Sequence, residues 1–474
     1  MKRIVLVNPP LSSRQQGSLL SSAIGRTIPY GLLSVAAAVR KAGYDVGVVD
    51  AANSDCGIRE AAAAVAGMRP DYIGISAVTV SIKNAGALAE EIKKLGCGVP
   101  VIIGGMHVSA LPEATMREFS GFDIGVVGEG EETIVELLSA LENKTGLYKV
   151  KGVVLRATGG PLRTAERPFI SDLDSIPLPA WDLAGGRDTF YRLSATSHIR
   201  LPAAPIVTSR GCTSNCIFCS CRAMFGDLRC FSVGYVMRMI KQLVNDYGIK
   251  DVSIYDDSFV SRRERVREFC ETILKEGPSF SWSCYSRVDH GDEELFRLMK
   301  KAGCWQISYG IESGSQRILD FIGKGVTLER IERAVNDTKK AGLRARGFFM
   351  LGHLSEDRAS MRETLRLLLK LKLDDFHIAY YNPFPGTKTA LLADRYGMVD
   401  PDWDKMNMHN PSFIPFGLTV KDLESSSKYA YRRFYFRARI ILGYLGIILR
   451  YPENILRVMK GFKAVICKIS MSET

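Results

Sequence analysis

Residues 205–219 read PIVTSRGCTSNCIFC, and this stretch decides how the larger half of the chain folds. A short β-branched run comes first. A glycine then leads into three cysteines, Cys212, Cys216 and Cys219, in a CxxxCxxC pattern. Iron–sulfur cubanes are normally held by four thiolates, and one compact loop can supply three of them. The pattern therefore predicts a [4Fe-4S] cluster whose fourth iron is open for chemistry.

Two other sites stay open as alternatives for these cysteines. One is a structural zinc ion with Cys221 or Cys230 as its fourth ligand, and the other is a closed electron-transfer cluster. Structural zinc sites favour CxxC pairs with a distant second pair, and the sequence has no such pair. Cys221 also follows Cys219 too closely to add an easy fourth corner. The spacing favours the open cluster.

Five further strand-like runs follow the cysteine loop at intervals of roughly 30 residues. Helical patterns separate them, so residues 201–395 are predicted to form a partial (β/α)6 barrel of the TIM type. Barrel strands carry their functional residues at their carboxyl ends. The runs cover residues 252–259, 280–287, 305–314, 343–352 and 375–387.

Residues 1–145 also alternate short β-branched runs with helical stretches. This α/β pattern predicts a doubly wound parallel sheet of the Rossmann type. Ligands bind such sheets at the carboxyl ends of the strands. Residues 146–200, with a short hairpin and a proline-rich stretch, are predicted to be a linker. The candidate ligand-binding residues at the strand ends are Ser76, Thr79, Gly104, Gly105, His107, Gly128, Glu129 and Gly130.

Composition indicates a cytoplasmic protein. Of 474 residues, 46% are apolar, which is enough for two cores. The N-terminal MKRIVLVNPP has only a short apolar run, unlike a secretion signal. We therefore expect the 11 cysteines to be reduced, apart from those that bind metal.

The net charge of +12 is concentrated near the C-terminus. Between residues 428 and 468, ten Lys or Arg face one acid, Glu453, which argues against a broad nucleic-acid-binding surface. Residues 396–474 are predicted to be a helical extension whose apolar run, 440–449, is too short to span a bilayer. Three interpretations stay open: contact with an anionic membrane surface, packing on the barrel with a solvated basic face, and RNA contact.

The barrel half resembles the radical S-adenosylmethionine (SAM) enzymes. The resemblance covers about residues 200–390 and rests on CxxxCxxC at the first strand. It implies that the open iron binds S-adenosylmethionine and that reduction releases a 5′-deoxyadenosyl radical. Asp256 or Asp257 has a second interpretation as a helix cap. Matching the family's motifs, the predicted contacts to S-adenosylmethionine are Asp256, Asp257, Glu312, Ser313, Gly347 and Met350.

The N-terminal half resembles the cobalamin-binding domain that is fused to many radical SAM enzymes. The match rests on NPP at 8–10, GISAVT at 74–79, GGMHVSALPE at 104–113 and GVVGEGEET at 125–133. The DxHxxG motif that supplies a cobalt ligand in classical B12 enzymes is missing, and His107 is spaced differently. The resemblance therefore implies cobalamin without that imidazole ligand.

Together, the two resemblances imply a cobalamin-dependent methyltransferase that acts on an unactivated carbon. The basic apolar tail resembles that of members acting on hydrophobic molecules, so we expect a lipid, isoprenoid or tetrapyrrole-like small-molecule substrate. An electron donor such as flavodoxin or ferredoxin is expected, and contact with the membrane periphery is one of the open interpretations of the C-terminal segment. The alternatives are radical oxidation, cyclisation or rearrangement without net methylation, and a non-catalytic cobalamin or redox sensor.

Overall fold

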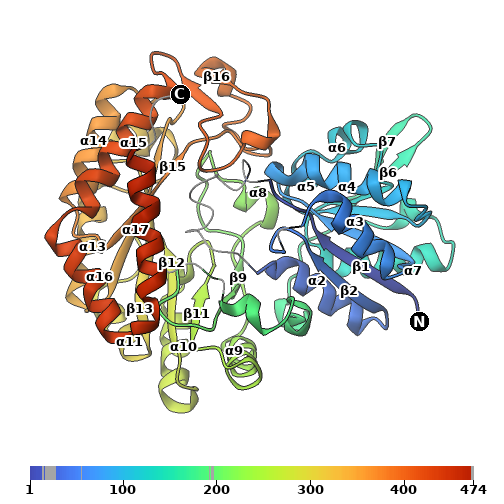
Figure 1. Ribbon diagram of the computed structural model, residues 1–474, viewed down its shortest axis with the longest axis horizontal. Coiled ribbons are helices and arrows are strands. Elements are labelled where there is room, and N and C mark those ends of the chain that lie inside the picture. Colours follow the sequence, from blue (N-terminus) through green and yellow to red (C-terminus); the bar gives the residue numbers. More distant parts are fainter. Residues whose placement is uncertain (13–14, 16–27, 55, 192, 194–196, 471–474) are drawn as a thin grey trace.

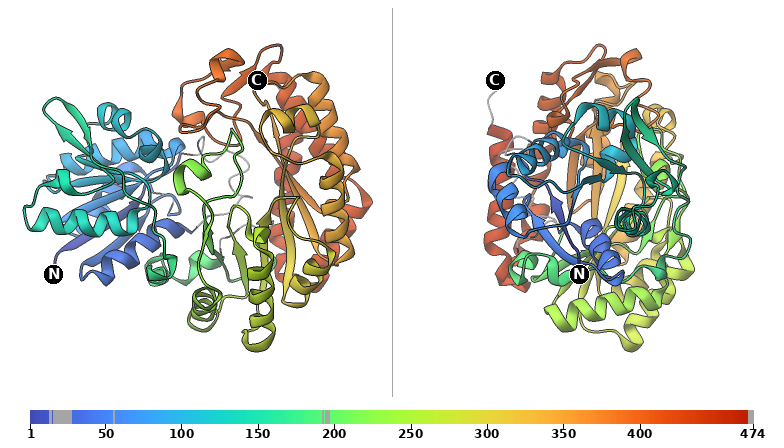
Figure 2. Two further views of the ribbon diagram at one scale, coloured as in Figure 1. Left: turned by 180° about the vertical axis from the view of Figure 1, so that it is seen from behind. Right: turned by 90° about the vertical axis from the view of Figure 1, so that its right-hand side faces the viewer.

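Two α/β units lie side by side in the computed structural model, with the N-terminal sheet beside a C-terminal half-barrel (Figures 1 and 2). The structure describes residues 1–474 except 13–14, 16–27, 55, 192, 194–196 and 471–474. The predicted fold class, a parallel sheet followed by a partial barrel and a helical C-terminus, is confirmed.

The first sheet has the strand order β2-β1-β3-β4-β5-β6-β7, and β1 to β5 are parallel. Helices cover both faces of the sheet. Successive side chains of a strand point to opposite faces, so each strand contributes to both cores. Ile4 and Leu6 pack under one helix layer, while Val5 and Val7 pack under the other. The strands are β1 (Arg3–Asn8), β2 (Asp45–Asp50), β3 (Tyr72–Ser76), β4 (Val101–Gly104) and β5 (Ile124–Val126), and the helices are α2 (Tyr30–Lys41), α3 (Ile58–Gly67), α4 (Ile82–Lys94), α5 (Met106–Ala110), α6 (Pro112–Glu118) and α7 (Gly130–Glu142).

A hairpin extends this sheet beyond the predicted boundary at residue 145. Strands β6 (Val153–Ala157) and β7 (Gly160–Arg163) are antiparallel, and β6 pairs with β5. Val153 and Val154 are fully buried, so the hairpin belongs to the sheet and its core. The segment that crosses to the barrel begins after Arg163.

The barrel half is a six-stranded parallel sheet in the order β15-β14-β13-β12-β11-β8. Its strands match the six predicted runs. Helices cover its outer face, and the largest hydrophobic core lies between them and the sheet. The strands are β8 (Ala203–Ile206), β11 (Asp251–Ile254), β12 (Ser281–Ser286), β13 (Cys304–Glu312), β14 (Arg344–Leu351) and β15 (Asp375–Tyr380), and the helices are α9 (Val233–Tyr247), α10 (Arg263–Glu276), α11 (Glu293–Lys301), α12 (Gln316–Phe321), α13 (Leu328–Lys340) and α14 (Arg358–Lys370).

The last helices among the described residues are α15 (Val420–Tyr435), α16 (Ala438–Arg450) and α17 (Ile455–Ser470). Helix α15 packs on the barrel, where the rings of Phe376 and Phe434 lie 4.8 Å apart. A small hairpin, β16 (Gly397–Val399) and β17 (Phe413–Pro415), precedes them. Within the described ranges, no helix combines the length and apolar character that crossing a membrane requires.

Candidate functional site

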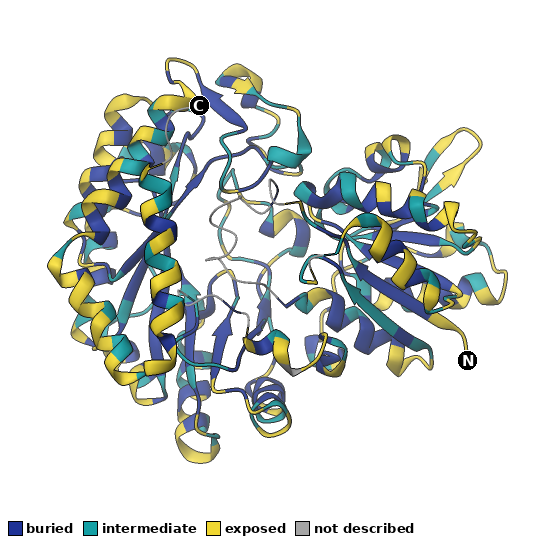
Figure 3. Cartoon of the chain, in the orientation of Figure 1, coloured by how far each residue is buried: buried dark blue, intermediate teal, exposed yellow. Residues whose placement is uncertain are grey.

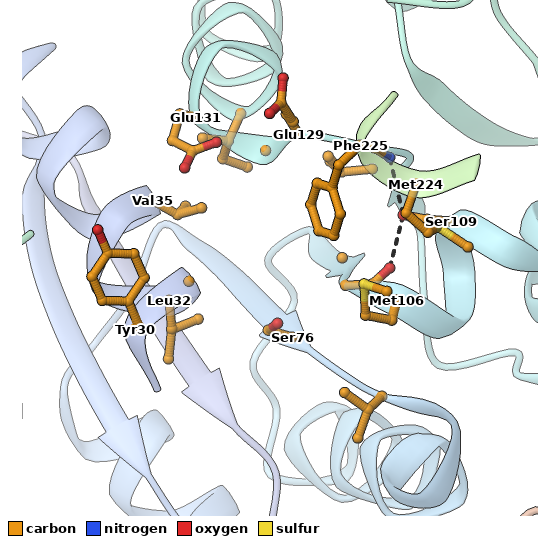
Figure 4. A pocket seen from close by; sticks show the side chains of 18 of the residues that line it. Tyr30, Leu32, Val35, Ser76, Met106, Ser109, Glu129, Glu131, Met224 and Phe225 are labelled. Carbon is orange, nitrogen blue, oxygen red and sulfur yellow. Dashed lines mark hydrogen bonds between the residues drawn. The ribbon is translucent and has the colours of Figure 1, made fainter. Parts of the chain in front are cut away.

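A cavity of about 420 Å³ lies between the two halves, at the carboxyl edge of the first sheet (Figure 4). Its lining is mostly apolar. The barrel half contributes a second wall with Val207, Arg210, Phe225, Tyr255 and Asp257. Six of the residues predicted from strand ends line the first wall: Ser76, Gly104, Gly105, Gly128, Glu129 and Gly130.

Two adjacent glycines shape this wall in different ways. Gly105 has φ +101°, and a Cβ there would lie 2.6 Å from the carbonyl oxygen of Ala77, so a larger residue does not fit. A Cβ on Gly104 would meet no atom within 4 Å, and the same holds for Gly128. These two positions are open backbone, so a wide planar ligand can approach the strand ends closely.

Thr79 and His107 lie next to each other and outside the cavity lining. The His107 Nδ1 is 3.3 Å from the Thr79 hydroxyl, and its ring meets Trp403 edge-on at 5.2 Å. Burial lowers the pKa of His107 to about 4, so the ring is neutral near pH 7. Their assignment as cofactor contacts stays a prediction.

Glu129, predicted to contact a cofactor, forms ion pairs that join the two halves. Arg210 binds the carboxylate of Glu129 at 2.9 Å and that of Glu131 at 2.5 Å, and Arg229 binds Glu129 at 3.0 Å. Burial alone would raise the pKa of Glu131, but Arg210 and Ser34 hold it below its usual value. Both arginines belong to a two-stranded ribbon, β9 (Ser209–Arg210) and β10 (Arg229–Cys230), next to the cysteine loop.

The three predicted cluster cysteines lie on the loop between β9 and α8 (Cys221–Phe225). Gly211 starts the loop with φ +82°, and a Cβ there would lie 2.4 Å from the Asp227 carbonyl oxygen. Two backbone N–H groups donate to sulfur: Ser214 to Cys212 and Cys221 to Cys219, each at 3.4 Å. Such donors stabilise thiolates, so the loop suits an anionic iron–sulfur centre.

The cysteines do not converge on one point. Across the part of the chain that the structure describes, no three His, Cys, Asp or Glu side chains are placed to hold a single metal ion. In a cubane each thiolate binds a different iron, so such convergence is required for zinc but not for a cluster. Cys221, one of the two candidate fourth ligands in the zinc alternative, donates to Asp257 at 2.9 Å.

Two basic side chains lie near Cys216. The Arg287 guanidinium lies 3.8 Å from its sulfur and donates to the Lys324 carbonyl oxygen at 2.7 Å. The Lys324 ammonium binds the Glu312 carboxylate at 2.8 Å, and both groups are buried. Burial raises the pKa of Cys216, and the charges of Lys324 and Arg287 oppose that rise.

Glu312, a predicted cofactor contact, has a strained backbone. Its φ is +68°, a conformation that a side chain other than glycine rarely adopts and that costs on the order of 1–3 kcal/mol. Strain of this kind is retained where the surrounding structure fixes a side chain for a purpose. Here it aims the carboxylate at Lys324, beside the cysteine loop.

The two acidic residues at the end of β11 have separate environments. Asp256 is buried and accepts four hydrogen bonds from the amides and hydroxyls of Thr208 and Ser209, at 2.5 to 3.1 Å. It therefore holds the strand that leads into the cysteine loop. Asp257 lies at the cavity wall, where one of its carboxylate oxygens accepts from the Cys221 thiol at 2.9 Å.

The other predicted contacts on the barrel lie deeper. The Ser313 hydroxyl is fully buried and bonds with Thr364 at 3.1 Å. A Cβ on Gly347 would lie 2.8 Å from the Leu373 side chain, so glycine is needed there for packing. Met350 is half-buried on the inner face of β14, beside the Leu354 and Tyr381 cluster.

A row of aromatic side chains crosses the inner face of the barrel. The ring of Tyr285 on β12 lies 5.4 Å from Tyr255 and stacks on Phe348 of β14 at 5.7 Å. Strand β13 separates β12 from β14, and its small Ser308 and Gly310 lie below the contact. Phe348 in turn meets His377 at 6.0 Å. All four rings are half-buried, whereas their strand neighbours are buried under the helices.

Sequence patterns had not assigned a role to several of these groups. Lys324 lies in a turn and carries no local signal, and Arg210 is one of many arginines. The aromatic row could have been found from strand alternation, because Tyr255, Tyr285 and Phe348 are spaced to face inward on their strands. Strand alternation does not show which of these rings contact one another, because that depends on the register between the strands.

Comparisons with known proteins agree with this geometry. Residues 18–138 match a family model described as B12 binding domain, and residues 206–368 match the Radical SAM superfamily. An uncharacterized methyltransferase of Pyrococcus horikoshii is 33% identical over 93% of this chain and 94% of its own length. The chain belongs to the B12-binding radical SAM enzymes.

Two further similarities fall within this family. The anaerobic magnesium-protoporphyrin IX monomethyl ester cyclase of Cereibacter sphaeroides is 28% identical over 94% of this chain and 75% of its own length. The structure of the radical SAM methyltransferase TsrM from Kitasatospora setae, with cobalamin and a [4Fe-4S] cluster bound, has a TM-score of 0.72. It is 17% identical and covers 92% of this chain and 89% of its own, which shows a shared fold. The predicted family, enzyme class and cofactor classes are thereby confirmed at the level of the family.

Proposed function

We propose that this B12-binding radical SAM enzyme methylates an unactivated carbon of a hydrophobic small molecule. The aromatic row on the inner face of the barrel carries the proposal. Its rings present aromatic surface on the inner face of the barrel, where Tyr285 stacks on Phe348 and the other two rings meet them edge-on. Aromatic faces bind planar or alicyclic apolar molecules well, so a tetrapyrrole, isoprenoid or other lipid suits this surface.

The residues present fit the cofactors of the family. Cys212, Cys216 and Cys219 would hold the cluster, and the open glycine edge of the cavity would take cobalamin. Asp257 and Glu312 offer carboxylates for S-adenosylmethionine. A cluster with bound S-adenosylmethionine supplies a carbon-centred radical when reduced, and cobalamin carries a methyl group.

The chain's own side chains position these reactants. Arg287 and Lys324 place positive charge beside Cys216, where it favours the thiolate. Asp256 fixes the backbone of Thr208 and Ser209, which sets the start of the cysteine loop. Tyr255 lines the cavity and its ring also contacts Tyr285, so the cavity and the aromatic row share this residue.

Radical oxidation or ring closure without net methylation is the second candidate. The magnesium-protoporphyrin cyclase relative, at 28% identity, favours it. Transfer of a labelled methyl group from S-adenosylmethionine to product separates the two candidates. Either reaction needs a low-potential electron donor, for which we propose a flavodoxin or ferredoxin.

Formation of 5′-deoxyadenosine tests the radical chemistry. The protein is reconstituted anaerobically with iron, sulfide and hydroxocobalamin, then incubated with S-adenosylmethionine and dithionite. We expect the wild type and Cys270→Ala, a buried thiol of α10, to form 5′-deoxyadenosine. Cys216→Ala should form none. Failure of the wild type to do so, with candidate substrates present, would favour the sensor.

The role of the aromatic row in holding substrate is tested by comparing how much substrate is modified with how much 5′-deoxyadenosine forms. Tyr285→Ala and Phe348→Ala remove two rings of the row. Phe348 also contacts the Arg346 guanidinium at 4.9 Å, but neither ring lines the cavity, so the cofactors should still bind. We expect the ratio of modified substrate to 5′-deoxyadenosine to fall about tenfold, because the substrate is no longer held. Tyr148→Ala, at an exposed position on the first domain, is the control. An unchanged ratio would rule the row out as the substrate surface.

A further inference from the structure

Helix α16 turns an apolar face toward solvent. Ala438, Leu442, Leu445 and Leu449 follow one another at helical spacing and are therefore on one side. The three leucines are 66%, 47% and 83% exposed. The opposite side, with Ile440 and Tyr444, packs inward. The outer face of a solvated helix is normally polar, so this pattern is reversed.

Helix α17 also exposes apolar side chains. Residues 451–454 turn the chain back, and Tyr444 of α16 meets Phe462 of α17 at 5.5 Å, so the two helices form an antiparallel pair. We call residues 438–470 the C-terminal hairpin; Figure 3 shows exposed residues along both helices. Its second helix exposes Ile455, Leu456, Met459 and Ile466, at 48% to 67%. Both helices of the hairpin therefore expose apolar side chains.

Exposed positive charges border this surface. Arg450 ends α16, and Lys460 and Lys463 lie on the outer side of α17. Arg457 is different, since it donates to the carbonyl oxygens of Leu193 and His198. Glu453 is the single exposed acid in the hairpin. Arg439, at the start of the hairpin, donates to the Leu373 carbonyl oxygen, and Arg432 and Arg433 are exposed on α15.

We infer that the C-terminal hairpin binds the surface of an anionic lipid bilayer. The leucine stripe enters the boundary between headgroups and acyl chains, and the bordering Lys and Arg side chains bind lipid phosphates. A second copy of the chain fits this surface less well, because pairing would bring two basic borders together. The inference goes beyond the proposed function and does not depend on catalysis.

Vesicle sedimentation with the full-length, reconstituted protein tests the inference. We expect binding to vesicles of phosphatidylglycerol and phosphatidylcholine, weak binding to phosphatidylcholine alone, and a loss of affinity at high salt. The double variant Leu442→Glu, Leu449→Glu should bind at least about tenfold more weakly. Leu391→Glu, 85% exposed elsewhere on the barrel half, should bind like the wild type.

A second measurement uses other variants, so its result does not depend on whether the double variant folds. Leu449→Trp fluorescence should be quenched by vesicles that contain brominated lipid, and Leu391→Trp fluorescence should not. Equal binding of the wild type and double variant, or no binding to anionic vesicles at low salt, would overturn the inference. A wild-type dimer in light scattering that the double variant loses would likewise overturn it, in favour of self-association.

Discussion

Gly104 and Gly105 are neighbours, yet the structure gives them different tasks. A methyl group on Gly105 meets the Ala77 carbonyl oxygen and requires a positive φ, whereas one on Gly104 enters the cavity. We expect Gly105→Ala to lower the free energy of unfolding by about 2 kcal/mol or more. Gly104→Ala should change it by less than about 0.5 kcal/mol but weaken hydroxocobalamin binding. Urea midpoints and cobalamin titration measure both; equal destabilisation would contradict the difference.

Glu356 is a buried acid in the loop between β14 and α14. Its carboxylate accepts the amides of Gly352 and His353, and burial raises its pKa to about 8. Because the folded pKa lies above the unfolded value, its contribution to stability is greatest below about pH 4.5 and is lost as pH rises toward 8.

The variant Glu356→Gln should remove this pH dependence. Between pH 6.5 and 8 the wild type should lose on the order of 2 kcal/mol, while the variant stays nearly constant. Urea midpoints of the anaerobic protein at the two pH values provide the measurement. Asp357→Asn, a change in the exposed helix cap next to it, keeps a good N-cap residue, so it should change stability by less than about 1 kcal/mol and leave the pH slope unchanged. A steep slope in Glu356→Gln would assign the effect to other groups.

At the scale of elements, buried ion pairs join Arg210 and Arg229 of the β9–β10 ribbon to Glu129 and Glu131 at the start of α7. Removing one partner of such a pair leaves an uncompensated charge. Arg210→Met should therefore lower the free energy of unfolding by about 3 kcal/mol. Arg222→Met breaks an exposed pair with Asp227 and should cost less than about 1 kcal/mol.

Partial recovery in the double variant Arg210→Met, Glu131→Gln would identify the unpaired carboxylate as the source of the loss. Urea unfolding of the three variants provides the comparison. Similar losses in Arg210→Met and Arg222→Met would show that the buried pair contributes no more than a surface pair.

At the scale of the whole molecule, the cavity has walls from both halves, so its ligand should couple them. Hydroxocobalamin at a hundredfold excess over its Kd should stabilise the protein by about 2.7 kcal/mol. Hydrogen exchange should slow at Gly104 and Gly105 and also at Val207 and Arg210, across the junction. Protection confined to the first sheet would show that the ligand does not bridge the halves.

The sequence by itself determined the features that arise between near neighbours in the chain. The cysteine spacing, the six barrel strands, the parallel sheet and the basic C-terminal segment each follow from a local pattern, because hydrophobic period and ligand spacing are set within a few residues. Six of the eight strand-end candidates lie at the cavity for the same reason: carboxyl ends of parallel strands share one edge.

The tertiary structure decided what depends on residues far apart. Glu129 pairs with Arg210 and Arg229. Thr79 and His107 contact each other outside the cavity lining, and Tyr285 stacks on Phe348 across Gly310. The tertiary structure also added the 153–163 hairpin to the first sheet. Strand register and the packing of one half against the other set these contacts. Both depend on the fit of whole surfaces, which no local pattern encodes.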